Sequence, residues 1–251
     1  MEREVVNNAF YNDLGSQWYE ADDHPIALLR AENRARAPWV AAQLASHFTA
    51  PCSVLDIGCG AGFLSNCLAQ LGHELTGVDL SSSSLKVAQA YDTTRTANYN
   101  QADARSLPFQ QGQFDAVCAM DLLEHVEEPA LVISEASRVL KPGGLFFFHT
   151  FNRTWLSWLF AVKGIEWFIP NAPRHIHLYR LFIKPCELTT YLHQSGLKLS
   201  EIHGLVPRID KSFLKLLLRR GIPSQFSFKT IPSLVCGYVG FATKPFLNSD
   251  L

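Results

Sequence analysis

The stretch VLDIGCGAG, residues 54–62, decides the fold class. It joins a short β-branched run to a helix-forming sequence through a tight turn that carries Gly58, Gly60 and Gly62. Glycines at such a turn let the backbone adopt left-handed angles and leave room for a ligand against the main chain. The next strand-like run ends at Asp79, where a carboxylate is placed to accept hydrogen bonds from both ribose hydroxyls of a nucleoside. These features predict a strand–turn–helix unit that binds a nucleoside.

The turn does not match the loops that bind phosphate. Those loops carry a lysine after their glycines, which is absent here, and the Asp56 carboxylate would repel a phosphate. A carboxylate at this point suits a nucleoside that carries a cationic amino acid tail. A nucleotide fold with an inactive or NAD-type site is the alternative that the turn leaves open.

The pattern after residue 51 is an alternation of strand-like and helical runs. Such alternation predicts an α/β fold with a doubly wound, Rossmann-like and mostly parallel sheet. The seven expected strands are residues 53–58, 73–80, 99–103, 114–120, 145–151, 197–205 and 233–244. We expect a single domain made of N-terminal helices, a ligand-binding core, a hydrophobic insertion after the fifth strand and a C-terminal part of the sheet, in residues 1–50, 51–151, 152–182 and 183–251.

Composition restricts the class of partner. The formal net charge of −1 gives no reason to expect nucleic acid. Six cysteines without C-x-x-C spacing are typical of a reducing compartment. The N-terminal residues are polar and acidic, unlike a secretory signal, and no run of about 18 uncharged apolar residues exists that could span a bilayer. We therefore expect a soluble or peripheral protein.

The segment MDLLEHVEEP, residues 120–129, follows the fourth expected strand, at the edge where open α/β sheets bind ligands. Asp121, Glu124 and His125 fall within five residues and suit a divalent cation, Mg²⁺, Mn²⁺ or Zn²⁺, that would lower the pKa of a bound hydroxyl. The alternative is a loop that covers the site, with His125 as a general base. His149 is a further candidate base or a strand-end histidine.

The stretch TWLSWLFAVKGIEWFIP, residues 154–170, contains three of the five tryptophans. Such density suits a buried core, a channel for an apolar substrate or a membrane surface. Lys163 and Glu166 interrupt it. A second apolar and basic run, KSFLKLLLRR, would attract anionic lipid or form a solvated helix face. Its basic residues are Lys211, Lys215, Arg219 and Arg220.

Two sets of motifs resemble a known superfamily. The glycine turn and the segment ADARSLPFQQGQFDAV, residues 102–117, resemble motif I and the following motifs of class I S-adenosylmethionine-dependent methyltransferases. The resemblance implies S-adenosylmethionine as the cofactor, with Asp103 beside the adenine amino group and Met120 lining the cofactor pocket. Methyl transfer from a sulfonium needs mainly the positioning of the two reactants and activation of the acceptor.

A narrower resemblance begins at residue 151. The segment FNRTWLSWLFAVKGIEWFIPNAPRHIHLYRLFIKPCEL resembles the corresponding part of ubiquinone-biosynthesis O-methyltransferases, and DLLEHV is similar to their E-x-L-E-H-V, which is associated with a divalent metal. Arg36 matches a residue assigned to the cofactor site. Asp121 replaces the family's glutamate, which shortens its reach, and residues 207–233 have no counterpart. The resemblance covers about residues 10–205.

This resemblance implies an acceptor and a location. The acceptor would be a phenolic or catecholic hydroxyl of a polyprenylated ubiquinone precursor, methylated in a site where Glu124 and His125 act. The protein would be cytoplasmic and contact the inner face of the membrane through residues 154–170, and it could join a ubiquinone-biosynthesis complex. The rivals are a class I methyltransferase for another hydrophobic small molecule and a non-catalytic, membrane-associated scaffold.

Overall fold

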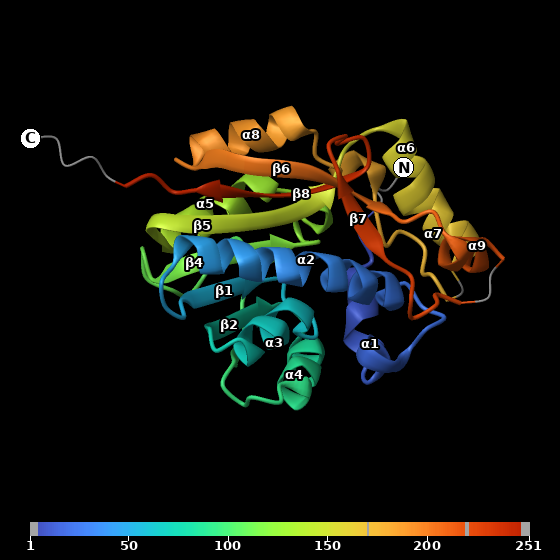
Figure 1. Ribbon diagram of the computed structural model, residues 1–251, viewed down its shortest axis with the longest axis horizontal. Coiled ribbons are helices and arrows are strands. Elements are labelled where there is room, and N and C mark those ends of the chain that lie inside the picture. The colour runs from blue at the N-terminus through green and yellow to red at the C-terminus, as the bar shows by residue number, and fades with distance from the viewer. Residues whose placement is uncertain (1–4, 170, 219–220, 247–251) are drawn as a thin grey trace, which may run out of the picture.

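A central sheet organises the computed structural model, which describes residues 5–169, 171–218 and 221–246 (Figure 1). Eight strands of the described chain pair in the order β3-β2-β1-β4-β5-β8-β6-β7. Strands β1 to β5 are mutually parallel, β8 is antiparallel to β5 and β6, and β7 is antiparallel to β6. The strands are β1 (Ser53–Ile57), β2 (Glu74–Asp79), β3 (Asn98–Gln101), β4 (Phe114–Met120), β5 (Leu140–Phe151), β6 (Lys198–Pro207), β7 (Phe228–Ile231) and β8 (Gly237–Thr243).

Helices cover both faces of the sheet. Figure 1 shows α2, α3 and α4 on one side and α5 and α8 on the other. The helices of the sheet layer are α2 (Ile26–His47), α3 (Phe63–Gln70), α4 (Ser82–Tyr91), α5 (Pro129–Val139) and α8 (Pro185–Gln194). Successive residues of β5 point to opposite faces of the sheet. Phe147 packs with α2 and α3, whereas Phe146 and Phe148 pack with α5 and α8. The predicted doubly wound α/β fold is therefore confirmed.

The remaining helical elements are short and lie at the carboxyl edge of the sheet or beyond β5. They are η1 (Asn8–Asp13), α1 (Gln17–Glu20), η2 (Leu123–His125), α6 (Trp155–Ser157), the π-helical turn η3 (Trp158–Gly164), α7 (Ile165–Phe168), η4 (Tyr179–Leu181) and α9 (Lys211–Leu217). None of the helices in the described part of the chain is both long and apolar enough to cross a membrane.

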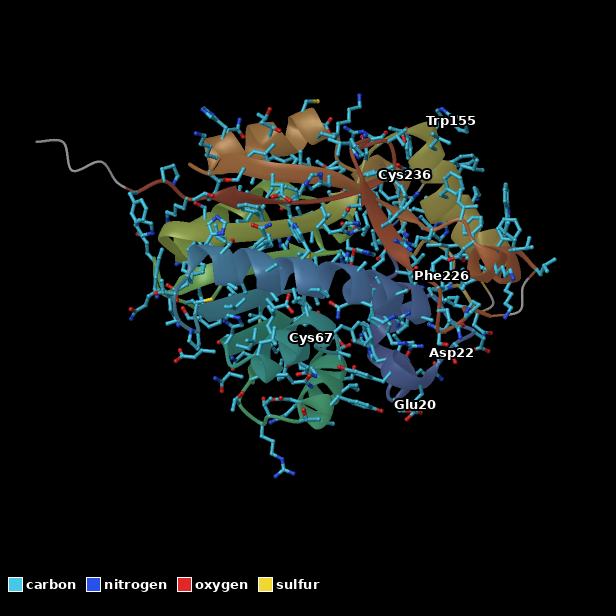
Figure 2. All side chains as sticks on the ribbon, in the orientation of Figure 1. Glu20, Asp22, Cys67, Trp155, Phe226 and Cys236 are labelled. Carbon is cyan, nitrogen blue, oxygen red and sulfur yellow. The ribbon has the colours of Figure 1, made fainter. Side chains whose placement is uncertain are left out.

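The tryptophan-rich segment forms the helical run α6–η3–α7. Its Ile165 and Ile169 pack against α2 and against Leu216 of α9 in a separate apolar cluster. The side chains of Trp155, Trp158, Phe160 and Trp167 are exposed instead, and Figure 2 places Trp155 at the outside of the molecule. Pro170, at the end of this segment, lies outside the described residues.

The structure adds a strand to the seven expected from the sequence. Strand β7 extends the sheet beyond β6, within the 207–233 segment that has no counterpart in the resemblance. The basic run begins as α9, whose Asp210 cap accepts hydrogen bonds from the backbone of Ser212 and Phe213. Arg219 and Arg220 lie outside the described residues.

Candidate active site

The glycine turn is held against the end of β2. Gly58, Gly60 and Gly62 all have positive φ, at 70°, 52° and 78°. The Gly60 N–H donates to the Asp79 carboxylate at 2.9 Å. A Cβ on Gly62 would lie 2.8 Å from the Tyr99 hydroxyl. A side chain on Gly62 would therefore disturb the packing of the turn; the cofactor contact predicted for the three glycines stays a prediction.

A cleft of about 550 Å³ opens at the carboxyl ends of β1, β2 and β4. Its position is the ligand-binding edge of an open α/β sheet. The predicted residues that line it are Arg36, Asp56, Gly58, Gly60, Asp79, Asp103, Met120, Asp121 and His125. Gly62 and Glu124 are not among the lining residues.

Two carboxylates, Asp56 and Asp79, line the cleft beside the glycine turn. Asp56 is buried and accepts a hydrogen bond from Ser65 Oγ at 2.6 Å. Burial, helped by the nearby Asp79 charge, raises the pKa of Asp56 to about 7. Asp79 also accepts from the backbone N–H of Ser81 at 2.8 Å, and burial raises its pKa. Asp103 lies farther along the cleft and is ion-paired with Arg105.

The N-terminal segment covers the cleft, a contact that local sequence patterns do not predict. Tyr11 and Trp18 line the cleft and stack on each other at a centroid distance of 5.6 Å. Hydroxyls at the start of α4 hold η1 in place: Ser84 Oγ donates to the Tyr11 carbonyl at 3.1 Å and Ser83 Oγ to the Asn12 carbonyl at 2.8 Å. The aromatic residues in AFYNDLGSQWYE, residues 9–20, are the sequence feature that could have indicated this cover.

Asp121 lies at the centre of a buried ionic network. It has a φ of 58° and accepts hydrogen bonds from both Nη atoms of Arg36 on its two oxygens. Its Oδ1 also contacts Nδ1 of the buried His149. Burial would raise the pKa of Asp121, but the Arg36 guanidinium and His149 hold it well below its usual range. Glu32 completes the network beside Arg36, and burial next to Asp121 raises the pKa of Glu32 to about 8.

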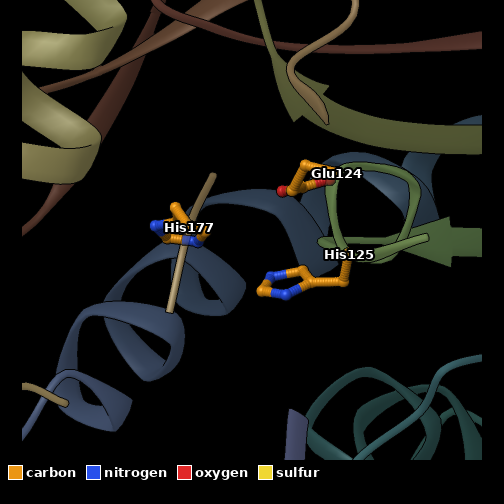
Figure 3. Close-up of side chains that lie close together, drawn as sticks. All are labelled: Glu124, His125 and His177. Atoms are coloured by element: carbon orange, nitrogen blue, oxygen red, sulfur yellow. The ribbon is translucent and has the colours of Figure 1, made fainter. Parts of the chain in front are cut away.

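A second cluster contains Glu124, His125 and His177. Glu124 is fully buried, and neither of its carboxylate oxygens has a hydrogen-bond partner among the described residues. Burial and the Asp121 charge raise its pKa to about 8. Burial and the neighbouring His177 lower the pKa of His125 to about 3. In Figure 3 the three side chains surround a common space.

The three residues predicted to share a cation are thus divided between two clusters. Glu124 and His125 lie together, whereas the carboxylate of Asp121 faces Arg36 and His149. His177 was not predicted as a site residue, although it stands in the segment from residue 151 that carries the narrower resemblance. The signal was present, but the spacing of more than 50 residues hid the contact.

Comparisons with known proteins agree with this geometry. Residues 55–148 match a family model described as a methyltransferase domain. The solved magnesium protoporphyrin IX methyltransferase of Synechocystis PCC 6803 is 18% identical, with a TM-score of 0.63 over 94% of this chain and 97% of that chain. A methyltransferase of Methanosarcina mazei is 22% identical, with a TM-score of 0.58 over 82% and 98% of the two chains. These structures show the class I methyltransferase fold.

Curated relatives are more similar. The ubiquinone biosynthesis O-methyltransferase of Xanthomonas oryzae is 38% identical over 196 residues, which cover 77% of this chain and 80% of the relative. The protein of the same name from Paraburkholderia xenovorans is 37% identical over 78% of this chain and 84% of its own length. The predicted family is confirmed: the chain belongs to the ubiquinone biosynthesis O-methyltransferases, a family of S-adenosylmethionine-dependent enzymes.

Proposed function

We propose that the protein transfers the methyl group of S-adenosylmethionine to a phenolic or catecholic hydroxyl of a polyprenylated ubiquinone precursor. The observation that carries this proposal is the continuity of the cleft. One cleft extends from Asp79, at the predicted nucleoside end, to His125 and Glu127 at the acceptor end. A cofactor bound along it would direct its sulfonium methyl toward the Glu124–His125 segment.

The cofactor residues have complementary proposed roles. The Asp79 carboxylate would accept the ribose hydroxyls, and Asp103 would lie beside the adenine amino group. Asp56 would pair with the cationic amino group of the methionine tail, and Arg36 with its carboxylate. Met120 would pack against the apolar part of the ligand. The positions of these five residues along the cleft support this assignment.

Acceptor activation would take place at Glu124 and His125. A general base works best with a pKa near the operating pH, and burial lowers the pKa of His125 far below it. The buried Glu124 carboxylate without partners instead fits a cation ligand. A bound divalent cation supplies Lewis-acid chemistry that lowers the pKa of the acceptor hydroxyl. Within this proposal, Glu124 and His125 would hold the cation beside the acceptor hydroxyl.

An exposed aromatic face supports peripheral contact with a membrane. In the run α6–η3–α7, Trp155 is 67%, Phe160 51% and Trp167 49% exposed. Tryptophan and phenylalanine are favoured at the lipid–water interface. We propose that this face docks on the cytoplasmic side of the membrane that contains the polyprenylated acceptor. A contact with other enzymes of the pathway is the competing use of this surface.

The experiment is an acceptor comparison with the purified protein. Labelled S-adenosylmethionine is offered with a short-chain demethylubiquinol, with an unprenylated catechol and with a polyketide phenol, and the products are identified by mass spectrometry. We expect an O-methylated product with the demethylubiquinol and slower turnover with the unprenylated catechol. Preferred methylation of the polyketide phenol would contradict the proposed acceptor. A protein that fails to bind the cofactor would indicate a scaffold.

A further inference from the structure

We propose that Tyr11 and Trp18, the two stacked aromatic residues of the N-terminal segment, recognise the positive charge of the sulfonium group of S-adenosylmethionine. The pair would make the cleft bind this cofactor more tightly than S-adenosylhomocysteine, the uncharged thioether that methyl transfer leaves behind. The inference rests on the proposed function only for the position of the cofactor in the cleft, and its test needs no acceptor.

Trp18 is packed on the glycine turn. It comes from α1 and is only 4% exposed. A Cβ built on Gly60 would lie 3.0 Å from its indole ring, and the same Gly60 donates its backbone N–H to Asp79. Phe63, at the start of α3, meets the indole in an edge-to-face contact at a centroid distance of 5.6 Å. Trp18 therefore borders the part of the cleft in which Asp79 is proposed to bind the ribose.

Tyr11 continues this aromatic surface toward the acceptor segment. Its ring stacks on Trp18 with an interplanar angle of 22°. The same ring meets the imidazole of His125 edge-on, at a centroid distance of 6.1 Å. The two rings thus extend along the wall of the cleft from the glycine turn to His125. In S-adenosylmethionine the sulfonium joins the ribose to the transferable methyl group. A cofactor with its ribose at Asp79 and its methyl directed toward His125 would therefore place the sulfonium beside these rings.

The electrostatic surroundings of Tyr11 favour a cation. Burial raises the pKa of the Tyr11 phenol, and nearby carboxylates raise it further. Those carboxylates belong to Asp121, Glu124, Asp79 and Glu32. Arg36 compensates part of their charge through its pair with Asp121. The phenol therefore stays uncharged, and a cation beside its ring gains from both the aromatic surface and the remaining negative charge.

Hydrogen bonds to the backbone hold the two rings in place. Arg30 of α2 donates through Nη1 to the Trp18 carbonyl at 2.8 Å. Ser84 of α4 donates to the Tyr11 carbonyl at 3.1 Å. The rings are thus positioned in the ligand-free fold, so little conformational entropy is lost when a ligand binds against them.

Methyl transfer removes the charge that the rings would recognise. The acceptor hydroxyl gives up its proton to solvent, its oxygen bonds the methyl carbon, and the C–S bond breaks. The sulfur keeps the electron pair of that bond and becomes a neutral thioether. The attraction between a cation and an aromatic ring disappears with the charge, so the product should be released more easily than the cofactor.

The test measures the affinity of the purified protein for three ligands by isothermal titration, with no acceptor present. The ligands are S-adenosylmethionine, S-adenosylhomocysteine and sinefungin, an analogue that carries an ammonium group in place of the sulfonium. The unmodified protein should bind the two cationic ligands more tightly than S-adenosylhomocysteine. Tyr11→Leu and Trp18→Leu should each reduce this preference about threefold to 30-fold, the range of one cation–π contact.

Variants that retain an aromatic ring are the first control. Tyr11→Phe and Trp18→Phe should keep the preference for the cationic ligands. Trp18→Phe removes an indole N–H that has no hydrogen-bond partner in the described chain, so its loss should cost little stability. Tyr91→Leu is the matched control for packing. It removes a ring that stacks on Tyr19 of α1 at 3.8 Å, but Tyr91 is not among the residues that line the cleft. The unfolding transition verifies that each variant is folded.

Equal affinity of the unmodified protein for S-adenosylmethionine and S-adenosylhomocysteine would overturn the proposal. So would Leu variants that keep the preference, or that weaken the binding of all three ligands equally, because the rings would then only pack the site. A selective loss of the two cationic ligands in a protein that methylates no demethylubiquinol would support sulfonium recognition and contradict the proposed reaction instead.

Discussion

Arg36 of α2 donates hydrogen bonds to both carboxylate oxygens of Asp121, which follows β4 and lies 85 residues later in the sequence. Both side chains are nearly removed from solvent, with relative exposures of 5% and 14%. The pair fixes the N-terminal helix layer to the strand end from which the acceptor segment begins. Asp121 has a left-handed backbone conformation, with a φ of 58°, which is uncommon for residues other than glycine but which aspartate adopts more readily than most.

Replacing Asp121 by Ala should destabilise the protein markedly. The change leaves the buried Arg36 guanidinium with only the more distant Glu32 carboxylate, at 3.9 Å, and loss of one member of a buried pair costs about 3–5 kcal/mol. Chemical denaturation of the cofactor-free protein measures the free energy of unfolding. Asp103→Ala is the control, because its exposed pair with Arg105 should contribute about 1 kcal/mol or less. Equal losses in the two variants would show that the Arg36–Asp121 pair does not stabilise the fold.

Replacing Asp79 by Ala should weaken S-adenosylhomocysteine binding about 100-fold or more. The variant loses the acceptor for two ribose hydroxyls, and each hydrogen bond to a charged group contributes about 1.5–3 kcal/mol. Isothermal titration measures the affinity. In contrast, Glu124→Gln should bind this product normally and lose turnover, because Glu124 does not line the cofactor cleft. Unchanged affinity of Asp79→Ala would indicate that the nucleoside binds in another part of the cleft.

Cofactor affinity should rise with pH and level off above about pH 7. In the free protein Asp56 has a pKa of about 7, and only its ionised form attracts the cationic amino group of the ligand. Below pH 7 the ligand must displace a proton, so affinity falls by up to about tenfold per pH unit. Titrations between pH 5.5 and 8.5 test this, and Asp56→Asn should remove most of the slope. An unchanged slope in Asp56→Asn would assign the titration to a different group.

The same raised pKa has the opposite effect on the stability of the free protein. Because folding raises the pKa of Asp56 above its unfolded value of about 4, this carboxyl favours the folded state most at low pH. That contribution decreases as the pH rises toward 7. The ligand should therefore raise the melting temperature more at pH 8 than at pH 6, which differential scanning fluorimetry can measure.

Replacing Trp155, Trp158 and Phe160 by Ser should release the protein from anionic liposomes without unfolding it. These side chains are 67%, 39% and 51% exposed, so their removal costs little core packing. Sedimentation with liposomes reports binding, and the unfolding transition reports the fold. Leu71→Ser removes a 61% exposed apolar side chain far from this face and should leave binding intact. Undiminished sedimentation of the triple variant would favour a protein partner for the aromatic face.

The sequence predicts the sheet where its local patterns are strong. The short β-branched runs and the glycine turn agree with the structure. Strand β7 escaped prediction because FKTI is short, lies at the sheet edge and has no buried residue to give it a hydrophobic pattern. An edge strand of this kind is defined by its pairing with β6, which is a tertiary contact.

The candidate site shows the same contrast between features that local sequence patterns predict and features that depend on tertiary contacts. Residues grouped by motif, such as Asp56 and Asp79, could be placed from spacing because the turn and strand end fix them. The division of Asp121 from Glu124 depends on Arg36 and His149, which approach from other elements. His177 reaches the site only because the insertion folds back onto η2. Contacts between distant segments are therefore the part that local sequence patterns do not contain.

The most direct test of the proposed reaction is a single-turnover assay. The protein is loaded with methyl-labelled S-adenosylmethionine and mixed with a short-chain demethylubiquinol, and the label in the lipid product is followed over time. We expect transfer to the phenolic oxygen by the unmodified protein, and loss of transfer with retained cofactor in Glu124→Gln. Cofactor bound along the cleft but no label in the lipid, or full transfer by Glu124→Gln, would contradict the proposed reaction.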